Sequence, residues 1–161
     1  MPNLITNRLE ITGHEYAIFD LFLKINGGKD ENGQEMFIDF NKIIPMPETV
    51  ILGKQSWYEW VTSTKNWGTK CNAFAQYRIS YNCIEFNTIC CGVPNLIKKL
   101  SSMFPSLIIH YMYADAYWGS NVGKYVFNNR KLIYSVLPED NTLEARAIAK
   151  ELLGEEPDDE D

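Results

Sequence analysis

The sequence has little of what marks a membrane protein or a secreted one. Among its 161 residues, no apolar run approaches the ~18–20 residues that a helix needs to cross a bilayer. The N-terminal stretch MPNLITNRLEIT lacks the basic, apolar and small-residue zones of a signal peptide. These absences exclude a membrane-spanning class and predict a cytoplasmic protein.

Metal ligands are also scarce. The two histidines, His14 and His110, are far apart, and the cysteines at positions 71, 83, 90 and 91 contain no CxxC spacing. Adjacent Cys90 and Cys91 are poorly suited to be two ligands of one tetrahedral zinc. We therefore expect reduced thiols, no metal site and no cofactor.

A strong excess of basic charge is missing as well. The net charge of −6 arises at the C-terminal end, because EEPDDED (155–161) holds six of the 21 acidic side chains. Residues 1–154 thus carry 15 acidic and 15 basic side chains. A neutral body with an acidic end does not favour nucleic acid as the main partner. We expect 155–161 to be a disordered, solubilising tail, with contact to a basic partner as the alternative.

What the sequence does contain is the composition and periodicity of a globular domain, with 45% hydrophobic and 13% aromatic residues. The segment 14–26 repeats apolar residues from Tyr16 to Ile25 at helical spacing, which predicts a helix with one broad apolar face that includes Phe19 and Leu23. Alternation predicts strands over 3–12, 36–40, 73–81, 83–89 and 106–115, and two more around a turn at 128–129. Helical spacing also predicts helices over 54–65, 93–104 and 141–154, the last capped by Asn141 and ended by Gly154.

This order of elements predicts an α+β fold. Two βαβ-like halves with antiparallel pairing indicate a ferredoxin-like antiparallel sheet with helices on one face. We expect a domain over residues 1–140, a Trp/Pro-rich insertion at about 40–72, and a C-terminal helix over 141–154. Pro45 and Pro47 within the insertion exclude a regular helix or central strand there.

Three tryptophans fall close together in the insertion, and the last stands in the phrase NWGTK (66–70). A binding site would use Trp57, Trp60 and Trp67 as aromatic surfaces, with Asn66 and Lys70 as polar contacts. The structural alternative is a turn at Gly68, with Trp67 packed against the extended segment IIPMP (43–47). Both interpretations stay open from the sequence alone, and buried rings would favour the second.

Two further alternatives concern the predicted sheet. His110, with Asp115, Glu85 or Lys70, is the best catalytic set that the residues offer, but no nucleophile motif or paired carboxylates accompany it. Tyr111 and Tyr113 share one face of a strand and could stack RNA bases on an exposed sheet. We therefore keep a small enzyme and an RNA-binding module as alternatives to a protein-binding one.

Several phrases taken in order resemble one known family. NRLEITG (7–13), FDLFLK (19–24), FIDFNKIIPMPE (37–48), WYEW (57–60), NWGTK and KKLSSMFPSL (98–107) resemble the YubB ferredoxin-like family, also called Api92-like, whose members are encoded on phages and plasmids. The resemblance covers residues 1 to about 119. Cys71 and Cys90 stand where the family tends to carry tryptophan.

The resemblance implies a ferredoxin-like domain on a mobile genetic element and carries no established reaction with it. Together with the absence of a catalytic set, it leads us to expect a non-enzymatic accessory protein. Its expected partner is a protein of the host or of a defence system, bound through the Trp/Pro-rich surface, the acidic tail or both. The oligomeric state is left open.

Overall fold

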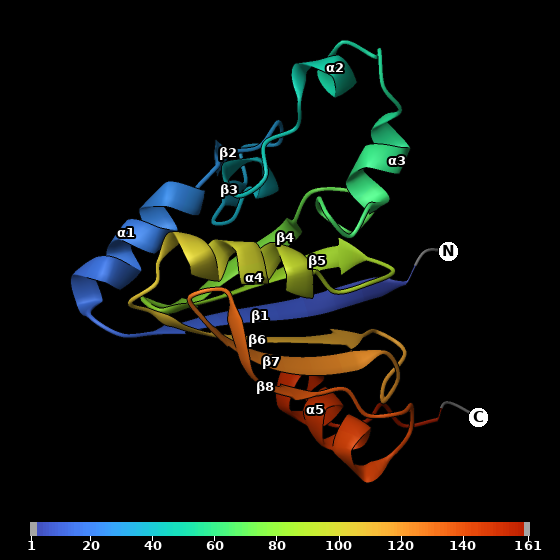
Figure 1. Cartoon of the computed structure of the whole chain (residues 1–161). Coiled ribbons are helices and arrows are strands. Elements are labelled where there is room, and N and C mark those ends of the chain that lie inside the picture. The colour runs from blue at the N-terminus through green and yellow to red at the C-terminus, as the bar shows by residue number, and fades with distance from the viewer. Residues whose placement is uncertain (1–2, 160–161) are drawn as a thin grey trace.

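The computed structural model describes residues 3–159, and a six-stranded antiparallel sheet forms its centre (Figure 1). The strands lie in the spatial order β4-β5-β1-β6-β7-β8. Their bounds are β1 Leu4–Thr12, β4 Phe74–Ser80, β5 Cys83–Ile89, β6 Ile108–Asp115, β7 Val122–Asn128 and β8 Lys131–Val136.

The first four strands of that order and two helices form a ferredoxin-like unit. Along the chain, β1, α1 (Glu15–Ile25), β4, β5, α4 (Pro94–Met103) and β6 give the β-α-β-β-α-β sequence of this fold. The helices α1 and α4 lie on the same face of the sheet (Figure 1) and share one core with the inward residues of β1, β5 and β6. The expected α+β fold is confirmed, and the β7–β8 hairpin extends its sheet beyond β6.

The C-terminal helix α5 (Leu143–Leu153) covers the opposite face of the sheet (Figure 1). Its Ala145 and Ile148 pack against Met112 and Ala114 of β6 in a second, smaller core. Alternation along β6 explains this arrangement, because successive side chains of a strand point to opposite faces. Helices therefore lie on both faces, and the cap of α5 is Thr142 rather than the expected Asn141.

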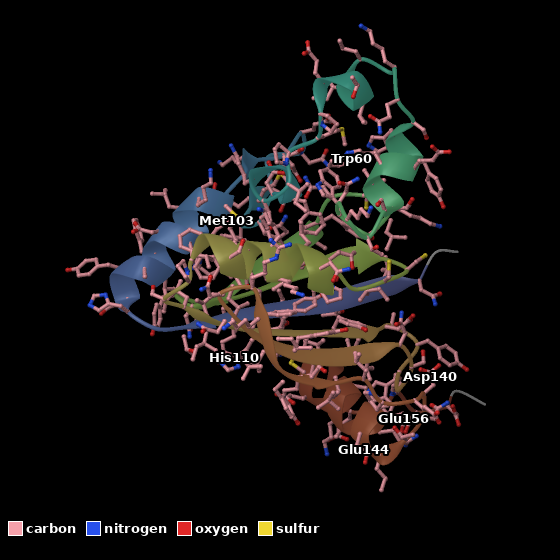
Figure 2. All side chains as sticks on the ribbon, in the orientation of Figure 1. Trp60, Met103, His110, Asp140, Glu144 and Glu156 are labelled. Carbon is pink, nitrogen blue, oxygen red and sulfur yellow. The ribbon has the colours of Figure 1, made fainter. Side chains whose placement is uncertain are left out.

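The C-terminal end of the chain begins by contacting this helix. Gly154, with a φ of 88°, ends α5 as expected. Glu155 then pairs with Lys150, and Glu156, which lies beside α5 in Figure 2, pairs with Arg146. The first part of the acidic segment thus lies against α5, whereas residues 160–161 of the expected disordered tail lie outside the described residues.

The insertion between α1 and β4 is built from short elements rather than from the strand expected over 36–40. That expectation is wrong, because Ile38 bonds through both its N–H and its C=O to the side-chain amide of Gln76 at 2.9 and 2.8 Å. Asp39 then caps a 3-10 helix by accepting from the Asn41 N–H at 3.0 Å. The elements are β2 Gly28–Lys29, β3 Glu35–Met36, η1 Phe40–Lys42, α2 Glu48–Ile51 and α3 Trp57–Thr62.

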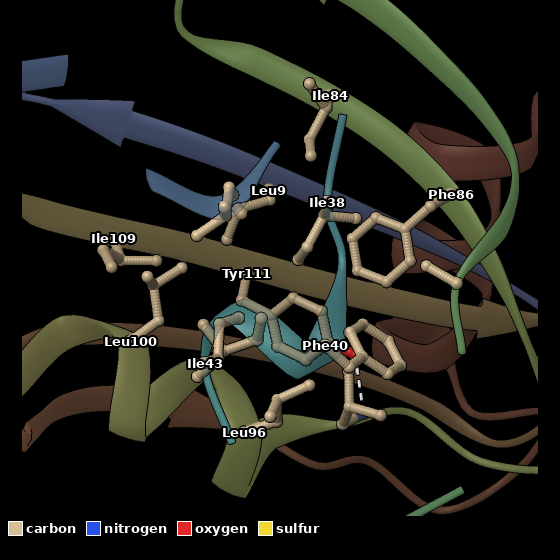
Figure 3. Close-up of a cluster of buried hydrophobic side chains, with 14 of the residues drawn as sticks. Leu9, Ile38, Phe40, Ile43, Ile84, Phe86, Leu96, Leu100, Ile109 and Tyr111 are labelled. Atoms are coloured by element: carbon tan, nitrogen blue, oxygen red, sulfur yellow. Dashed lines mark hydrogen bonds between the residues drawn. The ribbon is translucent and has the colours of Figure 1, made fainter. Parts of the chain in front are cut away.

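The insertion completes the main core instead of standing apart from it. Ile38, Phe40 and Ile43 are buried with Leu9 and Tyr111 of the sheet (Figure 3). This packing explains why an irregular segment holds one position, since it replaces strand pairing with burial of large side chains. Within residues 3–159, no helix is long and apolar enough to cross a membrane.

Candidate functional site

The tryptophans of the insertion divide into two buried rings and one partly exposed ring. Trp67 is 3% exposed and Trp60 is 8% exposed, and their rings meet edge to face at 5.5 Å. Trp67 also meets the edge of Phe40 at 5.8 Å. Trp57, at 46% exposed, faces solvent on α3. The three rings therefore do not form an open aromatic box.

The phrase NWGTK forms a turn that fixes the extended segment IIPMP. The indole Nε1–H of Trp67 donates to the carbonyl of Ile44 at 2.9 Å, and Asn66 donates to the carbonyl of Trp60 at 2.9 Å. Gly68 has a φ of 73°, which a residue with a Cβ rarely adopts. This geometry favours the structural interpretation of Trp60, Asn66 and Trp67, while Lys70 is exposed.

Tyr111 and Tyr113 lie on the face of β6 that the helices α1 and α4 cover. With Tyr125 of β7 they form a tyrosine stack, whose ring centres are 5.9 to 6.3 Å apart. Tyr111 is fully buried, and Tyr113 fits against Gly92 and Gly123, where an added Cβ would come within 2.5 Å of its ring. These tyrosines do not form the exposed base-stacking surface that RNA binding would use.

The hydroxyl of Tyr111 belongs to a buried polar network. It donates to the side-chain oxygen of Asn7 and accepts from the Val93 N–H at 2.8 Å. The Asn7 amide donates to the carbonyl of Phe86 and to the hydroxyl of Thr88. Every buried side-chain polar atom that the structure describes has a partner. Burial raises the pKa of all three tyrosines of the stack, so the network holds neutral hydroxyls in a structural role.

His110 lies on the other face of β6, in a depression of about 160 Å³. Its Nε2 is 3.4 Å from the Thr12 hydroxyl, and its neighbour on β1 is Glu10. Asp115 is an odd number of residues further along the same strand, so it points to the opposite face. Glu85 pairs with Arg8 at 3.4 Å. The structure does not assemble the catalytic set that was considered from the sequence.

A larger concave surface than the depression at His110 lies between helix α1 and the edge strand β4. This α1–β4 groove has a volume of about 990 Å³. Its apolar lining comes from one exposed side of the helix and from the end of the strand. The residues are the exposed Tyr16, Phe19 and Leu23 of α1 and the buried Phe22 below them, with Ile79 at the end of β4 and Tyr81 just after it.

Helix α1 differs from the expected single apolar face. Ile18, Leu21, Phe22 and Ile25 are buried in the core. Tyr16 is 77% exposed, and Phe19 and Leu23 are each 65% exposed. The core covers only part of the expected broad apolar face and leaves Phe19 and Leu23 outside, because a helix offers only a stripe of its surface to one sheet. In the sequence, apolar residues extend around more than half of this helix, and this width indicates a second contact surface beside the core-facing one.

Strand β4 adds a free backbone edge beside these rings. It is the outermost strand on this side of the sheet, and its first half packs beside the 30–38 segment, which lies against Phe74 to Tyr77. The second half, from Tyr77 to Ser80, is exposed on both faces. Arg78 lines the groove and lies over the Phe22 ring at 4.9 Å and over the Phe37 ring at 5.2 Å. Its guanidinium donates to the carbonyls of Ser80 and Tyr81, each at 3.3 Å.

Comparison with known proteins gives no further information on this groove. No protein-family model, no curated protein and no solved structure matches the chain. Within residues 3–159, no three His, Cys, Asp or Glu side chains come together in an arrangement that could hold a metal ion. The α1–β4 groove is the candidate functional site on its geometry alone.

Proposed function

We propose that this chain is a non-enzymatic protein-binding module that takes an extended apolar segment of a partner protein into the α1–β4 groove. The observation that supports this proposal is the groove itself, where solvent-exposed Tyr16, Phe19 and Leu23 lie beside the outer edge of β4. Large exposed apolar patches of this kind mark interaction sites in soluble proteins.

The free edge of β4 defines the chemistry of the occupant. An extended peptide that adds to an edge strand gains main-chain hydrogen bonds, and its alternate side chains enter the pockets beside the strand. In this chain the exposed part, Tyr77 to Ser80, is four residues long and borders the apolar lining, and its Ser80 carbonyl already accepts from Arg78 at 3.3 Å. The groove contains only Glu15 and Arg78 as charged side chains, so an uncharged, apolar segment is the complementary partner.

The resemblance to the YubB ferredoxin-like family supports a setting for this activity. In that setting the chain is an accessory protein of a phage or plasmid in the cytoplasm of a bacterial host. The partner is then a protein of the host or of its defence systems. The tryptophans contribute by holding the insertion, and Trp57 and Tyr58 are the aromatic side chains of α3 that remain available for contact.

The proposal is tested by panning a phage-displayed random peptide library against the whole chain. We expect selected peptides with apolar residues at alternate positions. Phe19→Glu and Leu23→Glu should each weaken their binding about tenfold or more, because each change removes a contact of roughly 1.5–3 kcal/mol and buries a charge. The matched control is Tyr117→Glu, which changes an aromatic residue that is 73% exposed and lies outside the groove.

Three outcomes would overturn the proposal. The first is a selection in which no peptide requires Phe19 for binding. The second is equal weakening by Tyr117→Glu. The third is a dimer in sedimentation analysis that Phe19→Glu dissociates, since a second copy would then be the occupant of the groove.

A further inference from the structure

A second groove, of about 440 Å³, lies between α4, the segment after α3 and the β7–β8 turn. Its lining brings together four cationic side chains from three separate parts of the sequence. They are Lys65, Lys98, Lys99 and Arg130, with Ile44, Thr64 and Asn95 beside them. It shares no residue with the α1–β4 groove, so an inference about it does not depend on the proposed function.

The positive charge of this groove is not compensated by the protein. The ion pairs among residues 3–159 involve Arg8, Lys124, Arg146 and Lys150, none of which lines it. Helix α4 also has no acidic residue in its first turn. A cleft lined by charges of one sign concentrates the field and attracts ions of the opposite sign.

The turn that carries Arg130 is built at a conformational cost. It is a two-residue turn in which Asn129 and Arg130 have φ values of 46° and 68°. Glycine is the preferred second residue of such a turn, because it adopts positive φ without strain. The Arg130 N–H donates to the Ser101 hydroxyl at 2.8 Å, and this hydroxyl donates to the Lys98 carbonyl at 2.6 Å. A strained residue held against the lysine-bearing helix points to a role for its charge.

We propose that this basic groove binds a phosphate chain with three or more negative charges. Several cations of one compact site can neutralise consecutive phosphates, and the hydroxyl of Thr64 and the amide of Asn95 add hydrogen-bond donors. No aromatic ring is among the lining residues, so the groove has no surface on which a base could stack. The recognised chemistry is the phosphate chain itself, from a free nucleotide or from a nucleic-acid strand.

Tripolyphosphate is the probe for the first test, by calorimetric titration of the whole chain at low salt. We expect binding that weakens about five- to tenfold in Lys98→Gln and in Arg130→Gly, because each variant removes one charge-assisted contact. Arg130→Gly should at the same time raise the thermal midpoint, since glycine relieves the turn. Lys42→Gln is the matched control, because this exposed lysine lies outside the groove.

A second arm distinguishes the sources of the phosphate chain. A single-stranded oligonucleotide that contacts all four cations should bind with a slope of log K against log salt of about −2.8. Binding of both probes supports a nucleic-acid strand, and binding of tripolyphosphate alone supports a free nucleotide. The proposal fails if neither probe binds, if Arg130→Gly and Lys98→Gln bind as the wild type does, or if a polyglutamate peptide binds as tightly as the phosphates.

Discussion

Replacing Trp67 by phenylalanine tests whether NWGTK is an architectural turn. The substitution keeps an aromatic ring and removes the indole N–H that donates to the Ile44 carbonyl at 2.9 Å. It also shortens a ring that is 3% exposed and packed against Phe40 and Trp60. The perturbation is therefore confined to one hydrogen bond and to the space left by the smaller ring.

Two contributions set the expected loss of stability for Trp67→Phe. An acceptor left without its donor costs about 1–3 kcal/mol. The partly filled space adds about 1 kcal/mol, as smaller deletions from a packed core do. We expect the free energy of unfolding to fall by about 2–4 kcal/mol, a large part of the roughly 5–15 kcal/mol that holds a domain of this kind.

Urea denaturation followed by circular dichroism measures this loss, with Trp57→Phe as the control. Trp57 is 46% exposed, and its replacement should change the free energy of unfolding by less than about 1 kcal/mol. Limited proteolysis should cut Trp67→Phe faster between residues 43 and 56, because the IIPMP segment loses its anchor. A change below about 0.5 kcal/mol for Trp67→Phe would refute the anchoring role.

Three further predictions follow from the buried network, the tyrosine stack and the C-terminal end. Asn7→Ala should lower the free energy of unfolding by about 3 kcal/mol or more in urea denaturation, because the Tyr111 hydroxyl loses its acceptor and the Phe86 carbonyl loses the Asn7 donor. Asn41→Ala, near the surface, is the comparison. Burial raises the folded-state pKa of the three tyrosines of the stack. The stability that their neutral hydroxyls contribute is therefore complete below the unfolded pKa of about 10, and it is lost as pH rises through the folded pKa. Unfolding midpoints that stay constant above pH ~10 would contradict this assignment. Removing residues 155–161 should lower stability by less than about 1 kcal/mol in thermal melts, because the ion pairs with Arg146 and Lys150 are exposed; a larger loss would mean that the segment belongs to the fold.

The elements with strong periodicity could be predicted because local spacing fixes them. The strands β1, β5 and β6 and the helices α4 and α5 lie within a few residues of the expected ranges. Pro94 and Gly154 mark helix ends through backbone geometry that any tertiary context has to respect. The short elements of the insertion were not predictable in this way, because Gln76 replaces a strand partner for Ile38 from 38 residues away.

The surfaces of the molecule were harder to predict than its elements. Phe19 and Leu23 continue the apolar face of α1 by spacing, yet they lie on the part of the helix surface that the core does not cover. Lys65, Lys98 and Arg130 are unremarkable in sequence and converge only when α4, the segment after α3 and the β7–β8 turn come together. No local sequence pattern indicates a contact between such distant segments.

Local sequence patterns were enough to predict an α+β domain of strands and helices, an insertion in which Pro45 and Pro47 exclude a regular helix or central strand, and a helix ended by glycine. These features follow from side-chain periodicity and from the backbone limits of proline and glycine. The folded structure was needed to show that Trp60 and Trp67 are buried, which apolar side chains remain exposed, that α5 covers the second face of the sheet, and where the unpaired cations gather. Those outcomes depend on how much area each face of the sheet can cover and on which distant segments meet, and neither quantity is contained in any one stretch of the chain.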